Sequence, residues 1–111
     1  MIRLKPSPTF RFRVELAVPG SEDRAKFTLI GKHQGQSALK AWAEKAGEME
    51  GKDVVFLSSA IAGWEDVTDD EGKPVVWNEQ NFGALIDAYP GAGLAIFQAY
   101  IRELSAGRTK N

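Results

Sequence analysis

The feature that most constrains the fold is a two-residue alternation of apolar side chains near the N-terminus. Apolar residues occupy every second position from Phe10 to Val18, with mostly charged residues between them. A β-strand places alternate side chains on opposite faces, so this segment predicts a strand with one buried and one solvated face. Turn-forming residues follow at 19–23, and residues 26–30 fit a returning strand. The N-terminal part is therefore expected to form an antiparallel β-hairpin or meander.

Helical spacing follows this hairpin. Apolar residues three and four apart predict a helix that has Ser37 as its N-cap and ends between residues 47 and 51. A second, short helix is expected to have Asp53 as its cap, to carry an apolar stripe through Ile61 and to stop at Gly63. The first apolar residues of this second segment also fit a buried strand, so both alternatives stand.

Two further helices are expected near the C-terminus. Asn78 is well placed as the N-cap of the third helix, which Pro90 ends because the residue before a proline avoids the α region. Pro90 is also expected in the first turn of the last helix, with Gly107 at its end and a flexible tail over 107–111. The predicted fold is α+β, in which the hairpin or meander is followed by about four α-helices in a single domain of residues 1–111.

Residues 64–77 predict a short acidic hairpin loop. Its carboxylates suggest the calcium loop of an EF-hand, but Glu71 occupies the position of the required glycine, so a solvated turn is the better interpretation. Trp64 and Trp77 flank this loop, where a short hairpin offers little to bury them. Because tryptophan is frequent at the energetic centres of interfaces, these two residues are the candidate protein-binding residues. The other large aromatic residues are expected in the core.

Composition and spacing argue against catalysis and cofactors. The chain has no cysteine and a single histidine, His33, which excludes thiolate chemistry and sites with two histidines. Gly47 and Gly51 are too closely spaced for a P-loop, and Asp53 replaces its Ser or Thr. Fourteen Lys and Arg stand against fifteen Asp and Glu. We therefore expect a soluble protein that is not an enzyme, with no catalytic, metal or cofactor site and neither nucleic acid nor a membrane as a partner.

Several short stretches form a pattern over nearly the whole chain. They are Ser7-Pro8-Thr9-Phe10; Ile61-Ala62-Gly63-Trp64; Asp70-Glu71-Gly72-Lys73-Pro74-Val75; Asn78-Glu79; Tyr89-Pro90; and Gly107-Arg108-Thr109-Lys110-Asn111. In this order and spacing they resemble the tail assembly chaperones of long-tailed bacteriophages and prophages. The resemblance implies a factor in the host bacterial cytoplasm that binds the tape measure protein, recruits tail-tube subunits and is absent from the mature virion. It also implies no catalytic residues.

Other interpretations stay open. A structural phage tail or head-completion protein that stays in the virion would share the same size. An enzyme or metal protein would have to use His33 or the acidic loop, and a nucleic-acid binder would need one stripe formed by Arg3, Lys5, Arg11 and Arg13. Self-association is also left open. In families of this kind a ribosomal frameshift often adds a C-terminal extension, and the codons of Lys110-Asn111 suit a slippery run.

Overall fold

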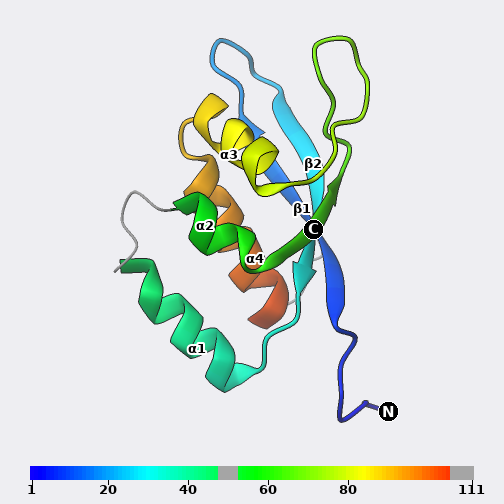
Figure 1. Cartoon of the computed structure of the whole chain (residues 1–111), viewed down its shortest axis with the longest axis vertical. Helices are drawn as coiled ribbons and strands as arrows, with labels where there is room; N and C mark the ends of the chain where they lie inside the picture. Colours follow the sequence, from blue (N-terminus) through cyan, green and yellow to red (C-terminus); the bar gives the residue numbers. More distant parts are fainter. Residues whose placement is uncertain (48–52, 106–111) are drawn as a thin grey trace.

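The computed structural model describes residues 1–47 and 53–105, in which four α-helices accompany a three-stranded antiparallel sheet (Figure 1). Its elements in chain order are β1 (Thr9–Ala17), β2 (Arg24–Lys32), α1 (Gln36–Glu44), the short 3-10 helix η1 (Lys45–Gly47), α2 (Asp53–Ser58), β3 (Ile61–Glu65), α3 (Glu79–Ala88) and α4 (Ala92–Ser105). The predicted α+β fold is confirmed. The predicted tail 107–111 and the helix end at Gly107 lie outside the described residues.

The N-terminal hairpin forms as its alternation predicts. β1 and β2 pair in antiparallel register, with Phe12 opposite Leu29 and Val14 opposite Phe27. These four side chains are at most 5% exposed and share one face of the sheet. The charged residues between them point to the other face, because side chains alternate along a strand. The two-residue period thus decides which face of the sheet carries the core.

The expected end of the second helix is wrong. α2 ends at Ser58, and Ile61 and Gly63 belong to β3, which pairs antiparallel with β2. The apolar spacing of α2 continues through Ile61, so periodicity alone did not reveal this change. The N–H of Lys32 on β2 donates to the C=O of Ala60 at 2.8 Å, which draws the chain after α2 onto the open side of β2. Main-chain pairing with β2 therefore ends the helix earlier than Gly63.

Helix starts follow the sequence only in part. Asn78 caps α3 as predicted, since its Oδ1 accepts the N–H of Asn81 at 2.7 Å. The predicted Ser37 cap is wrong: α1 is preceded by Gly35, whose C=O accepts the N–H of Leu39 at 2.8 Å, and no side chain caps that end. Ser37 lies inside the helix. A glycine can replace a capping side chain here because the open end of α1 faces water.

Pro90 separates α3 from α4. It ends α3 as expected, because Tyr89 before it is extended, with φ −120° and ψ 103°. Its expected place in the first turn of α4 is wrong, since Gly91 follows at φ +86° and α4 begins at Ala92. The positive φ of Gly91 turns the chain sharply, and glycine adopts this conformation without steric cost.

All four helices lie to one side of the sheet in Figure 1, and α4 packs directly on β1. The largest fully buried side chains join these layers: they are Tyr100, Phe12, Phe82, Leu29, Ile96 and Val14. α2 packs against α3, α4 and β3, while Trp42 of α1 stacks on Phe56 of α2 with ring centroids 4.3 Å apart. The opposite face of the sheet carries the charged residues of β1.

Candidate functional site

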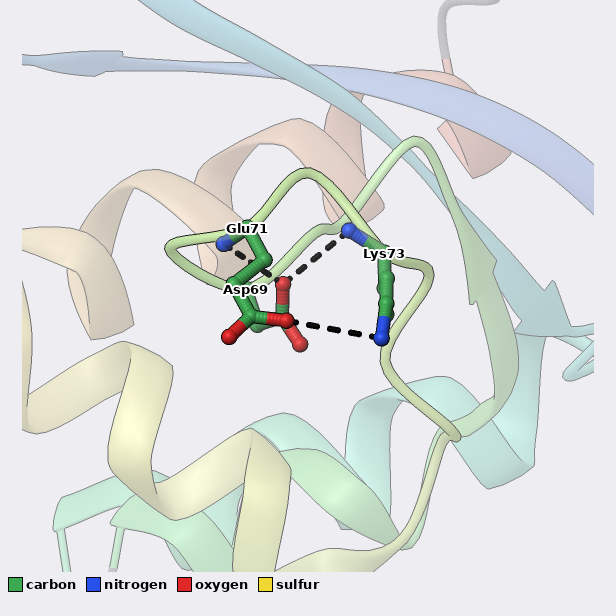
Figure 2. Close-up of polar contacts among 3 residues, drawn as sticks. All are labelled: Asp69, Glu71 and Lys73. Carbon is green, nitrogen blue, oxygen red and sulfur yellow. Dashed lines mark hydrogen bonds and ion pairs between the residues drawn. The ribbon is translucent and has the colours of Figure 1, made fainter.

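The acidic loop is closed by its own hydrogen bonds. An isolated bridge joins Thr68 to Pro74, and Oδ1 of Asp69 accepts the N–H groups of Glu71 at 2.9 Å and Lys73 at 3.0 Å (Figure 2). The side chains of Lys73 and Glu71 also form an ion pair at 3.4 Å. The predicted acidic hairpin loop is therefore present, and the carboxylate of Asp69 orders its main chain.

The two flanking tryptophans come together at the base of this loop. Their rings meet edge to face with centroids 5.2 Å apart, and the Trp77 ring lies 4.9 Å from that of Phe82. We call Trp64, Trp77 and Phe82 the aromatic corner. Phe82 is fully buried, and both tryptophans are half-buried against the core.

The expectation that the loop leaves the tryptophans with little cover is wrong. Trp64 lies opposite Leu29 in the β2–β3 register, so its side chain shares the core face of the sheet. Phe82, from the first turns of α3, then lies against Trp77. β3 and α3 supply the contacts that the sequence did not show.

Val76 has an exposed side chain beside the aromatic corner. Two hydrogen bonds hold the main chain at Val75 and Val76. The indole N–H of Trp64 donates to the C=O of Val75 at 2.8 Å, and the side-chain amide of Asn81 donates to the C=O of Val76 at 2.8 Å. The Val76 side chain is nevertheless 74% exposed. The position of Val76 is thus fixed before any partner binds, which lowers the entropy cost of a contact made by this residue. No sequence pattern singles out Val76, because its exposure depends on how the loop is fixed.

The remaining aromatic residues serve the core, as expected. Tyr100 is 1% exposed; its hydroxyl donates to the C=O of Lys32 at 2.6 Å and accepts the side-chain amide of Gln34 at 2.9 Å. Burial raises the pKa of the Tyr100 hydroxyl, and the hydrogen bond from Gln34 opposes part of that rise. Trp42 is half-buried, and its indole N–H donates to Oγ of Ser59 at 3.2 Å.

The structure assembles no catalytic group around His33. This residue is exposed between β2 and α1, and within residues 1–47 and 53–105 its ring has no hydrogen-bond partner. The hydroxyls of Ser58 and Ser59 donate to main-chain carbonyls at the end of α2. In the same described ranges, no cluster of three or more His, Asp or Glu is arranged to hold a metal ion, and none of the helices has the length and apolar character needed to span a bilayer.

A groove of about 730 Å³ lies beside β1. Its lining combines residues 11–15 of β1 and residues of α4, including Ala95 and Ala99, with Arg24 and Thr28 of β2 and Glu65 of β3. Arg11 and Arg13 share the outer face of the sheet, as expected from the sequence, but Arg11 pairs with Glu65 of β3 at 2.7 Å. The two arginines therefore differ, because the charge of Arg11 is paired with a carboxylate and Arg13 does not share that ion pair.

Comparison with known proteins supports the resemblance seen in the short stretches. A family model described as phage tail assembly chaperone matches residues 1–111, which is the whole chain. No curated protein and no solved structure gives a match. The match covers the hairpin, the acidic loop, the aromatic corner and all four helices alike. The chain therefore belongs to a family of phage tail assembly chaperones.

Proposed function

We propose that this protein binds the tape measure protein and recruits tail-tube subunits during tail morphogenesis. The observation that carries the proposal is the family match along the entire chain. On this proposal the protein works by binding, without catalysis, in the host bacterial cytoplasm, and it is absent from the mature virion. The tape measure protein is a long and aggregation-prone client, so the chaperone needs an apolar surface that is accessible before the client arrives.

The proposed contact surface is Val76 together with the exposed edges of Trp64 and Trp77. A fixed, solvent-exposed valine beside two half-buried indoles has the composition of an interface hot spot, where aromatic anchors are surrounded by smaller apolar contacts. The hydrogen bonds to the carbonyls of Val75 and Val76 hold this surface in one conformation. Binding there needs no large rearrangement of the main chain.

Substitution of Val76 by aspartate tests the surface without disturbing the core. Alanine at Trp64 and Trp77 is a poorer test, because removing the rings that pack on Phe82 costs about 3–5 kcal/mol for a fully buried tryptophan and part of that here. Val76→Asp changes an exposed side chain and should alter stability by no more than about 0.5 kcal/mol. A matched control is Val55→Asp on α2, where the valine is 51% exposed.

The assay is co-expression of the tape measure protein with the chaperone, with the soluble fraction and co-purification of the client as readouts. Wild type and Val55→Asp should keep the client soluble and bound. Val76→Asp should weaken binding about tenfold or more, the effect of losing one hot-spot contact. A client that stays insoluble with the wild type would contradict the proposed function. Unchanged binding by Val76→Asp would contradict only the contact surface.

The alternative function is a structural tail or head-completion protein. Mass spectrometry of purified virions separates the two functions, because a chaperone should be absent and a structural protein should be present in stoichiometric amounts. Detection of the chain at a fixed copy number per particle would overturn the chaperone proposal in favour of the structural one.

A further inference from the structure

Among the described residues, β1 is an edge strand, and one row of its main-chain groups has no strand partner. Sheet order in the part of the chain that the structure describes is β1-β2-β3, so β1 is paired on one side only. The N–H of His33 donates to the C=O of Pro8 at 2.9 Å and continues the β1–β2 ladder. Because hydrogen-bonded pairs alternate along an antiparallel ladder, the N–H and C=O groups of Arg11, Arg13 and Glu15 point to the open side.

There is room for another strand along this edge. The 730 Å³ groove includes residues 11–15 of β1 and extends over the outer face of the sheet to Thr28 and Glu65. On the α4 side its lining includes Ala95 and Ala99, whose side chains are short. Pro8 and Pro19 stand at the two ends of the strand and lack an N–H, so they limit any added pairing to the stretch between them. The free edge is thus nine residues long, from Thr9 to Ala17, and is not covered within the described ranges.

The charges on this edge are only partly neutralised inside one chain. Arg11 is held by Glu65 at 2.7 Å, and Glu15 has a long ion pair of 3.9 Å with Lys26. Arg13 lies opposite Thr28 and makes no ion pair with any residue in 1–47 or 53–105. Within the described residues, an arginine without an ion pair therefore lies two residues from a weakly paired glutamate on the same strand face.

We propose that two copies of this chain associate through antiparallel pairing of their β1 strands about a two-fold axis at Val14. In this register Arg13 of each copy lies opposite Glu15 of the other, so both charges gain a partner. Phe12 lies opposite Leu16 on the core face. The pairing forms about eight main-chain hydrogen bonds, two for each pair of outward-pointing residues between 11 and 17. The result is one continuous six-stranded sheet that leaves no edge at β1.

The charge pattern selects this register over its neighbours. Moving the axis to Arg13 places the two Arg13 side chains opposite each other; it also places Arg11 opposite Glu15, but Arg11 already has Glu65 as its partner. Moving the axis to Glu15 places the two glutamates opposite each other. Like charges directly opposite each other destabilise strand pairing, whereas opposite charges support it. We assign the open edge of β1 to a second copy of the chain because β1 itself supplies both the arginine and the glutamate of each charge pair. This association is independent of the tape measure protein and of the surface at Val76.

Charge reversal tests the pairing in the full-length protein. The wild type should sediment as a dimer, and Arg13→Glu and Glu15→Arg should each raise its dissociation constant about tenfold or more, since attraction becomes repulsion at two symmetric positions. An equimolar mixture of the two variants should restore dimers, because each of the two charge pairs across the axis then joins one glutamate to one arginine. Lys40→Glu, an exposed reversal on α1, is the control and should leave the dimer unchanged.

A single cysteine locates the axis. The chain has no cysteine, so Val14→Cys introduces the only thiol, and oxidation with glutathione disulfide should link two copies covalently because position 14 faces itself. Leu16→Cys, which faces Phe12, should remain unlinked. A wild type that stays monomeric, a mixture of charge variants that does not reassociate, or a folded Val14→Cys dimer without a cross-link would overturn the proposal.

Discussion

Replacement of Tyr100 by phenylalanine measures how much one buried hydroxyl contributes to the fold. Its oxygen donates to the C=O of Lys32 at 2.6 Å and accepts from Gln34 at 2.9 Å, so it joins α4 to the end of β2 and the segment that follows. The ring itself is 1% exposed and contacts Phe10 and Phe12. Tyr100→Phe keeps these ring contacts and removes only the hydroxyl.

The expected cost follows from the two groups that lose a partner. Leaving a buried donor or acceptor unsatisfied costs about 1–3 kcal/mol, and we take about 2 kcal/mol because Lys32 and Gln34 lie near the surface. For a chain of 111 residues the unfolding entropy is about 0.23 kcal/mol per kelvin. Tyr100→Phe should therefore lower the midpoint of thermal unfolding by about 9 °C.

The same substitution should change the pH dependence of stability. Burial raises the pKa of Tyr100 above its ordinary value of 10.0, so the folded protein keeps a proton that the unfolded chain has already released. This contribution to stability is fully present below pH 10.0 and is lost as the pH rises from there through the folded pKa. Tyr100→Phe has no such proton and should lose less stability in that alkaline range.

Chemical denaturation at pH 8 and in steps above pH 10, with thermal melts followed by circular dichroism, measures both effects. Tyr89→Phe is the matched control, since Tyr89 is half-buried and its hydroxyl makes no hydrogen bond within the described residues. If Tyr100→Phe melts within about 2 °C of that control, or if the two variants lose stability in parallel at high pH, the hydroxyl does not have the role assigned to it.

Two further substitutions test local structure. Asn78→Ala removes the cap of α3 and should lower the free energy of unfolding by about 1 kcal/mol; Gln80→Ala, at an exposed position in the same turn, should have little effect, and equal losses would contradict the capping role. Gly31→Ala should cost about 1–3 kcal/mol because its Cβ would lie 2.8 Å from Cζ of Phe10. Gly63→Ala meets only an ordinary contact at 3.5 Å, so a similar loss there would count against the steric argument.

Local signals were sufficient for much of the fold. The alternation from Phe10 to Val18 predicts β1 and its buried face, since the period of a strand depends on neighbouring residues alone. The cap at Asn78 and the stop at Pro90 are likewise properties of adjacent residues. The acidic turn closed by the Thr68–Pro74 bridge is local too, because only a few residues separate its two ends.

Distant contacts decided the rest. Ile61 and Gly63 continue a helical spacing but join β3, because β2 offers hydrogen bonds from a segment about thirty residues away, which periodicity does not report. The contact between Trp64 of β3 and Phe82 depends on where α3 docks, so the cover of this surface and the exposure of Val76 beside it were not foreseen.

The charges of β1 show most clearly which properties follow from the sequence and which follow from the tertiary structure. Sequence by itself determined that Arg13 and Glu15 share the solvated face of a strand, because side chains alternate along any strand. Only the tertiary structure decided that β1 lies at the edge of the sheet, that Arg11 is already paired with Glu65, and that Arg13 is left without a partner in the described residues. Strand order and ion pairing depend on segments distant in the chain, and hydrophobic periodicity holds no information about them.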